Sequence, residues 1–179
     1  MALSGEKDLL LDSLQSGLLG ISPTAGSFVA EACAICLTSQ GHASGVELKV
    51  SGLTSDTFRV WWNLEVTDQI RRSWGDEATE HGACAVAFLL IPKMTGYTII
   101  RRARTGTGVD YWLGYRESVN ILQDAARLEI SGILRATNMN AVQSRSNMKK
   151  RQTEQSDGAL PAYVVVVEFG MPQAQVVLK

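Results

Sequence analysis

Two acidic residues in the C-terminal half of the chain have the setting that shared metal chemistry requires. Asp110 lies at the start of the strand-like segment VDYWLGY, and Glu129 lies inside the strand-like segment ARLEISGIL. Because neighbouring side chains of a strand point to opposite faces, Glu129 and Ser131 share one face and Ile130 points to the other. Two carboxylates on adjacent strands, directed to the same side, offer the oxygen ligands that hard divalent cations prefer. The pair could therefore share one divalent cation, such as Mg²⁺ (or Mn²⁺).

The elements that must position this pair follow one another from residue 76 onward. Acidic residues at the start of 76–91 suit a helix N-terminus, and Pro92 is expected to end that helix. The segments YTIIRRA and VDYWLGY predict a hairpin, and ARLEISGIL predicts a third strand. A basic helix is expected over 138–155, followed by the apolar strand PAYVVVVEF and a short edge strand, AQVVLK. The predicted order is helix, three strands, helix, strand.

The first 75 residues predict an N-terminal elaboration of two helices and two strands. Leucines recur at helical spacing over 6–19, and an Ala-rich apolar helix is expected over 27–39. Alternating residues over 46–50 and 57–66 predict two strands joined as a hairpin, and Thr67 is placed to cap a further helix. Because 179 residues suit one domain, we expect a single domain, 1–179, in which 1–75 elaborates a core formed by 76–179.

The predicted order from residue 76 resembles the αβββαβ core of the restriction-endonuclease-like, PD-(D/E)xK, nuclease superfamily. In that family an aspartate begins the second strand and a Glu-x-Lys motif lies on the third. Asp110 and Glu129, which are 19 residues apart, match these two positions. The resemblance implies an α/β fold in which helices flank a mixed sheet, with the helical and β-hairpin elaboration in front of it. Ser131 stands where the family has lysine, so the chain resembles a degenerate member.

The resemblance also implies roles for residues around the pair. Asp110 and Glu129 would bind the metal, and the first core helix would supply a further ligand. The two residues suited to that role are Glu77 and Glu80, which share a helix face. The catalytic candidates are Asp110, Glu129, Ser131 and Lys149. The cation that replaces the missing lysine would come from the following helix, from Lys149, Lys150 or Arg145. The residues expected to contact nucleic acid are Arg101, Arg102, Arg145, Lys149 and Lys150.

Most of these assignments have a plainer structural alternative. Asp110 suits an ordinary turn, and Ser131 suits a small filler. The basic residues of 138–155 suit a solvated helix face, and Arg101 and Arg102 suit protection of an edge strand against aggregation. Glu129 is harder to explain structurally, because an unpaired carboxylate in the middle of a strand is costly to bury.

Composition narrows the setting in which such a site would work. The net charge of −1 gives no global basic field, so any nucleic-acid contact must come from a local patch. Cys33 and Cys36 form a CxxC pair with no second pair to complete a zinc site, so we expect buried, reduced thiols. The N-terminus lacks the layout of a signal peptide, and the apolar stretch 83–91 is about half the length of a membrane helix. We expect a cytoplasmic protein without membrane association.

The function expected from these features is that of a metal-dependent DNA nuclease, or a nuclease-like subunit of a defence or mobile-element system. A chain of this size without a recognition domain needs a protein partner or a larger complex to choose its target, and homo-oligomerisation is left open. The alternative is a catalytically inactive PD-(D/E)xK-like domain that serves as an assembly or regulatory subunit. A small-molecule-binding α/β protein finds less support, because the sequence contains no glycine-rich phosphate motif and no Ser–His–Asp set.

Overall fold

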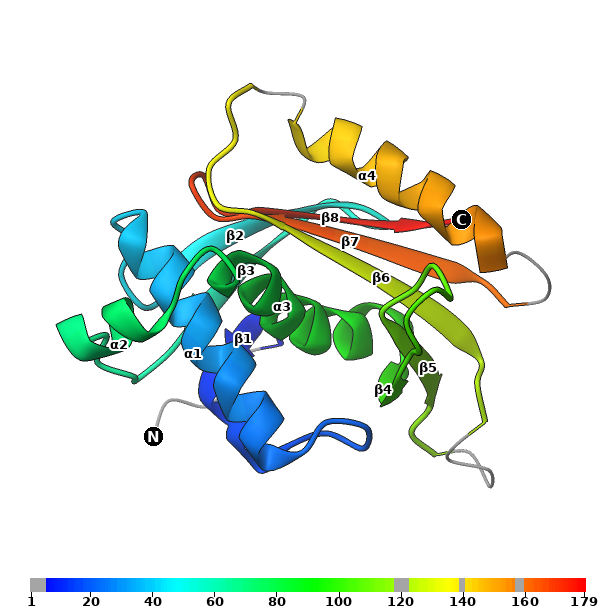
Figure 1. Ribbon diagram of the computed structural model, residues 1–179, viewed down its shortest axis with the longest axis horizontal. Helices are drawn as coiled ribbons and strands as arrows, with labels where there is room; N and C mark the ends of the chain where they lie inside the picture. Colours follow the sequence, from blue (N-terminus) through cyan, green and yellow to red (C-terminus); the bar gives the residue numbers. More distant parts are fainter. Residues whose placement is uncertain (1–5, 118–122, 139–140, 157–159) are drawn as a thin grey trace.

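The computed structural model describes residues 6–117, 123–138, 141–156 and 160–179, which form a mixed α/β fold. The strands join in one curled sheet in the order β1-β3-β2-β8-β7-β6-β5-β4. Helix α4 covers one face of the sheet, and α3 packs on the other with α1 against it (Figure 1). The elements are β1 (Asp8–Leu10), η1 (Leu11–Ser16), α1 (Pro23–Ser39), β2 (Val46–Gly52), β3 (Asp56–Trp61), α2 (Asp68–Ser73), α3 (Ala78–Thr95), β4 (Tyr97–Arg102), β5 (Tyr111–Tyr115), β6 (Ala126–Ile133), α4 (Ala141–Gln152), η2 (Thr153–Ser156), β7 (Ala162–Glu168) and β8 (Gln173–Leu178).

The order α3, β4, β5, β6, α4, β7 matches the order expected from the sequence. Strands β4, β5 and β6 form an antiparallel meander, whereas β6 and β7 run parallel. Parallel neighbours require a crossover connection, usually a helix, and α4 is that connection. Helix α4 therefore lies over β6 and β7, and every residue of β7 is buried because both faces of this strand are covered.

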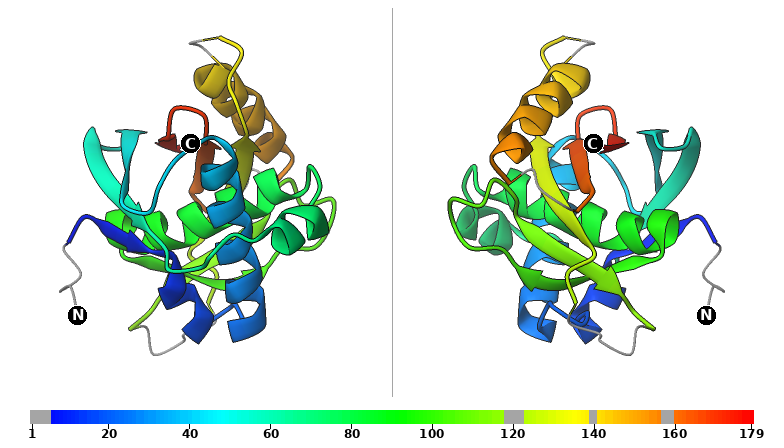
Figure 2. Two further views of the ribbon diagram at one scale, coloured as in Figure 1. Left: turned by 90° about the vertical axis from the view of Figure 1, so that its left-hand side faces the viewer. Right: turned by 90° about the vertical axis from the view of Figure 1, so that its right-hand side faces the viewer.

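The N-terminal hairpin belongs to the same sheet as the C-terminal strands. Strands β2 and β3 pair as the expected hairpin, and β2 also pairs in parallel with β8. The expectation that the last strand is an edge strand was therefore wrong, because β8 lies between β2 and β7. Leu48 and Val50 of β2 are buried in the main core, so this pairing extends the core. Figure 2 shows the sheet curling from β4 and β5 round to β2 and β3.

The leucine-rich segment 6–19 does not form the expected helix. Residues 8–10 form β1, which pairs in parallel with β3, and η1 follows as a short 3-10 helix. Leu9, Leu11 and Leu14 are all buried. Strand pairing and burial therefore determine the conformation of this segment, although the spacing of its leucines favours a helix.

Helix α3 does not end at Pro92, as the sequence led us to expect. It continues to Thr95 and ends at Gly96, whose φ of 75° places it in the left-handed region that favours glycine. A proline inside a helix removes one hydrogen bond and costs about 3 kcal/mol. Leu90 and Ile91 are fully buried beside it, and we attribute the tolerance of Pro92 to this packing.

Small residues bring α1 and α3 close together in the core. A Cβ atom at Gly82 of α3 would lie 3.1 Å from the Cα atom of Cys33 in α1. Cys33 and Cys36 are free and buried, and burial raises the pKa of the Cys36 thiol to about 12. Both features agree with the expected buried, reduced thiols. None of the helices in the described ranges is long and apolar enough to cross a membrane.

The close approach of α3 to β6 gives a test of this packing. A Cβ atom at Gly132 of β6 would lie 2.3 Å from the backbone oxygen of Thr79 in α3. We expect Gly132→Ala to lower the free energy of unfolding by about 1–3 kcal/mol, because the helix must move to relieve the overlap. Gly75→Ala is the control, since a Cβ atom there meets nothing within 4 Å. Urea unfolding of both variants measures the difference, and equal stabilities would contradict the described packing.

Candidate metal and phosphate site

The site begins where β5 stops pairing with β6. The two strands pair only as far as Tyr111 and Leu128, so further N–H groups on this edge of β6 need other acceptors. The Asp110 carboxylate accepts a hydrogen bond from the Ile130 N–H at 2.8 Å. The Glu80 carboxylate, from α3, accepts one from the Gly132 N–H at 3.1 Å. The carboxylates of Asp110 and Glu80 thus accept hydrogen bonds from N–H groups of β6 that lie beyond its pairing with β5.

The backbone of Asp110 is fixed on both sides. Its N–H donates to the Leu128 oxygen at 2.9 Å, and its own oxygen accepts from the Ala103 N–H at 2.8 Å. These two bonds join it to β6 on one side and to the end of β4 on the other. Backbone hydrogen bonds therefore fix Asp110 between two strands. It is not a freely exposed turn residue.

Two basic side chains of α4 lie over two polar side chains of β6. Lys149 Nζ is 2.7 Å from Glu129 Oε1, and Arg145 Nη1 donates to Ser131 Oγ at 3.3 Å. The spacing explains this match, because four residues of a helix rise about 6 Å and two residues of a strand about 6.6 Å. The helix of the crossover therefore places two cationic side chains beside Ser131 and Glu129. That one of them replaces the missing lysine stays a prediction.

Glu129 is ionised with difficulty. Its pKa is raised to about 7: burial raises the pKa most, the bond from Lys149 lowers it, and the neighbouring Asp110 carboxylate raises it. The Asp110 and Glu129 carboxyl groups line one pocket. Two acidic groups in one pocket compete for ionisation, and a nearby positive charge relieves the repulsion.

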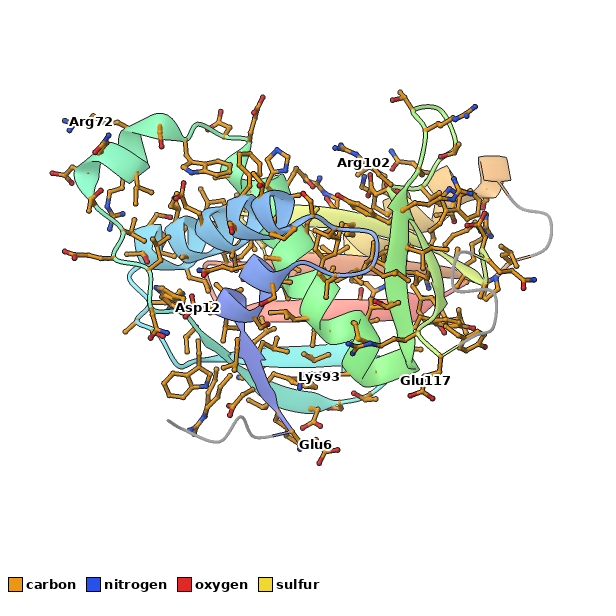
Figure 3. The ribbon with its side chains drawn as sticks, turned by 90° about the horizontal axis from the view of Figure 1, so that it is seen from below. Glu6, Asp12, Arg72, Lys93, Arg102 and Glu117 are labelled. Carbon is orange, nitrogen blue, oxygen red and sulfur yellow. The ribbon has the colours of Figure 1, made fainter. Side chains whose placement is uncertain are left out.

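The two carboxyl groups line a pocket of about 270 Å³. Its other wall is formed by the end of β4 and the loop that joins β4 to β5. The residues that line it are Arg102, Ala103, Arg104, Thr105, Gly106, Gly108, Val109, Asp110 and Glu129. Figure 3 shows Arg102 at one end of the β4–β5 hairpin and Glu117 at the other. Two carboxylates, of Asp110 and Glu129, and two arginines, Arg102 and Arg104, therefore line the same pocket.

Glu77 and Glu80, the candidates for a further metal ligand, do not join Asp110 and Glu129 in a common metal-binding group. Glu77 is exposed and immediately precedes α3, and Glu80 is engaged by the Gly132 N–H and the Ser131 hydroxyl. In the described part of the chain no group of three His, Cys, Asp or Glu side chains is placed to hold a metal ion. A third protein ligand from α3 stays a prediction. The two carboxylates of Asp110 and Glu129 are the donors that the geometry provides.

The expected nucleic-acid contacts separate into two groups. Arg101 does not face the pocket, because it is paired with Asp124 and its guanidinium lies 5.0 Å from the centre of the Trp112 ring. The contact of Arg101 with nucleic acid stays a prediction, and Arg102 lines the pocket. Arg145 contacts the Ser131 hydroxyl, and Lys149 contacts the Glu129 carboxylate. Lys150 is half-buried, and its contact with nucleic acid stays a prediction.

Two pocket residues of the loop are not among the residues expected at the site. Arg104 and Thr105 line the pocket together with two glycines of the segment TGTG. The available signal was a glycine-rich turn preceded by Arg102 and Arg104 and followed, after Val109, by the aspartate.

Glu168 is a buried carboxylate outside the site. It accepts hydrogen bonds from the backbone N–H groups of Ala136, Gly170 and Met171. These bonds tie the segment after β6 to the turn between β7 and β8. Its carboxylate is therefore satisfied by backbone donors and serves the fold.

The arrangement offers cation binding and anion binding side by side. Asp110 and Glu129 present oxygens to a positive ion, while Lys149, Arg145 and the pocket arginines present donors to an anion. Comparisons of the chain with protein-family models, curated proteins and solved structures found no match. Evidence on function therefore comes from the geometry of these side chains.

The raised pKa of Glu129 predicts a pH dependence of stability. Its ordinary pKa is 4.5 and its pKa in the fold is about 7, so the folded chain holds the proton more tightly. The stability from this group is present below pH 4.5 and is lost as the pH rises through 7. Since glutamine mimics the neutral acid, Glu129→Gln should be the more stable protein above pH 7, by up to about 3 kcal/mol.

Urea unfolding across this pH range, with chelator present, measures the difference between the variant and the wild type. Glu47→Gln is the control, because it removes a carboxylate whose side chain is 63% exposed. A gap between Glu129→Gln and wild type that does not widen with rising pH would contradict the described environment of Glu129.

Proposed function

We propose that this protein is a metal-dependent nuclease that acts on DNA through the Asp110–Glu129 pair, with Mg²⁺ or Mn²⁺ as its ion. The observation that carries the proposal is the presence of these two carboxyl groups in one pocket, with Lys149 of α4 at 2.7 Å from Glu129. Stability of the fold does not require this concentration of charge, because burial opposes ionisation of Glu129. Such clusters of perturbed groups in a pocket are typical of functional sites.

The topology around the pair supports the resemblance to the PD-(D/E)xK nucleases. Asp110 directly precedes β5 and Glu129 lies on β6, the second and third strands of an antiparallel meander. The crossover through α4 to the parallel strand β7 completes the order that the resemblance implies. We therefore take residues 76–179 to be a nuclease-like core.

The residues present fit a hard divalent cation. Mg²⁺ is usually held by one or two carboxylates and completes its shell with water and substrate phosphate oxygens. Asp110 and Glu129 supply the two carboxylates, and the ion would relieve the repulsion between them. When bound there, such an ion polarises the phosphate and lowers the pKa of a bound water.

The other side chains have distinct tasks in this proposal. The bond from the Ile130 N–H holds the Asp110 carboxylate in place. Lys149, which neutralises Glu129, can turn its ammonium toward a phosphate once Glu129 has another positive partner. Arg145, held at Ser131, adds a second cation on the same side. Both stabilise the negative charge that develops on the phosphate.

A second function is favoured by one observation. The Lys149–Glu129 ion pair neutralises the buried carboxylate without any metal, which is what an inactive, stable descendant of a nuclease requires. In that case the chain is an assembly or regulatory subunit of a larger complex. In either case we propose a protein partner, within a defence or mobile-element system, that selects the target.

DNA cleavage by purified protein separates these two functions. Wild type is incubated with plasmid and with single-stranded DNA, in Mg²⁺ or Mn²⁺. We expect cleavage that is lost in the double variant Asp110→Asn/Glu129→Gln, because the ion loses both carboxylates. Lys149→Met should lower the rate by about 10²–10³-fold, the usual loss for one charge-stabilising group.

Glu47→Gln serves as the control for a lost surface carboxylate, and circular dichroism verifies folding of each variant. Cleavage that persists in the Asp110→Asn/Glu129→Gln protein would exclude the proposed site. If wild-type protein leaves DNA intact, with its partner present as well, the assembly function is the better account.

A further inference from the structure

The loop between β4 and β5 is held in one conformation by its own hydrogen bonds. Thr107 donates from its hydroxyl to the Arg104 oxygen at 2.8 Å and from its N–H to the same oxygen at 3.3 Å. The bond from the Ala103 N–H to the Asp110 oxygen closes the base of the loop. Gly106 and Gly108 adopt positive φ values of 90° and 71°, which glycine tolerates without strain.

This loop presents free positive charge to the pocket. Arg102 and Arg104 are exposed and line the pocket, and among the described residues neither forms an ion pair. Arg101, the third arginine of the segment, is neutralised by Asp124. The segment 101–109 contains no acidic residue. The guanidinium groups of Arg102 and Arg104 are therefore available at a pocket that Asp110 and Glu129 also line.

The loop and α4 stand on either side of Glu129. The loop shares the pocket with the Glu129 carboxylate, and Lys149 of α4 contacts the same carboxylate. In Figure 1 the connection between β4 and β5 rises toward α4. A chain with repeated negative charges would thus meet cations on both walls and the carboxylate pair between them.

We propose that residues 102–109 form a phosphate-binding wall that grips the backbone of a nucleic-acid strand through Arg102 and Arg104. This proposal rests on the proposed function and names how the same site holds its substrate. One phosphate lies between the carboxylate pair and the α4 cations, and an adjacent phosphate lies against Arg102 and Arg104. Guanidinium groups suit this task because their planar donors match two phosphate oxygens at once.

The net charge of −1 makes this local patch decisive for affinity. Without a global basic field, few phosphate contacts contribute to binding, and each lost contact has a visible effect. Each neutralised phosphate contributes about 0.7 to 0.9 to the slope of log Kd against log salt concentration. Two arginines therefore have a measurable signature that is separate from catalysis.

Fluorescence anisotropy with labelled single-stranded and duplex oligonucleotides tests the proposal, with Ca²⁺ in place of Mg²⁺ to limit cleavage. Arg102→Ala/Arg104→Ala should raise Kd tenfold or more (about 1.4 kcal/mol or more) and should lower the salt slope by about 1.4 to 1.8. The matched control is Arg71→Ala/Arg72→Ala, which removes two exposed arginines from α2. This control should leave both quantities unchanged.

A second variant keeps every charge and changes only the loop conformation. Gly106 has a φ of 90°, and a Cβ atom there meets nothing within 4 Å, so Gly106→Ala strains the backbone without a clash. We expect several-fold weaker binding, because the two arginines lose their fixed placement. Gly75→Ala, which has the same open surroundings and no positive φ, should bind as wild type does.

The outcomes separate this proposal from the nuclease proposal. If wild type cleaves DNA while Arg102→Ala/Arg104→Ala keeps the wild-type Kd and salt slope, the phosphate wall is wrong and the nuclease stands. If wild type binds with the expected loss in the variant but never cleaves, the wall stands and the nuclease is wrong. An equal loss in the α2 control, or competition by a mononucleotide as strong as by the oligonucleotide, overturns the wall.

Discussion

Strand β6 has β5 as its partner along only part of one edge, and the N–H groups beyond that point need acceptors. Backbone donors that are buried without a partner cost free energy comparable to a lost hydrogen bond. Asp110 and Glu80 satisfy Ile130 and Gly132 in this way. The requirement fixes one carboxylate at the start of β5 and the N-terminal end of α3 against β6. Glu129, which directly precedes Ile130 in the sequence, is then brought to the pocket that Asp110 lines.

The charge state of Glu129 depends on burial and on its charged neighbours, Asp110 and Lys149. Burial and the Asp110 carboxylate oppose ionisation of Glu129, and Lys149 favours it. The crossover helix α4 supplies Lys149 because the parallel pairing of β6 and β7 requires a helix over this face. The same topology that places the helix thus determines which cations reach the pair.

The residues of the site could be predicted because their signals are local. Alternation along ARLEISGIL places Glu129 and Ser131 on one face, and the four-residue spacing of Arg145 and Lys149 places both on one side of a helix. The alternation also puts Arg101 and Arg102 on opposite faces, but it does not say which one meets the pocket. That choice depends on Asp124, which is distant in sequence and pairs with Arg101.

The features that sequence reasoning missed depend on long-range packing. Residues 6–19 have helical spacing, yet pairing with β3 makes part of them a strand. Strand β8 has the short, moderately apolar sequence of an edge strand, yet β2 covers its free side. Pro92 lies inside a helix, directly after the buried residues Leu90 and Ile91. In each case a partner far along the chain decides the outcome, and local propensity gives no sign of that partner.

The position of a bound ion is the most direct test of the Asp110–Glu129 pair. Crystals grown with Mn²⁺, with diffraction data collected at the manganese absorption edge, locate the ion by its anomalous signal. The account predicts one peak between the two carboxylates, with oxygen distances of about 2.0–2.2 Å and Lys149 withdrawn from Glu129. Absence of a peak there, with the ion pair between Lys149 and Glu129 intact at saturating Mn²⁺, would contradict it.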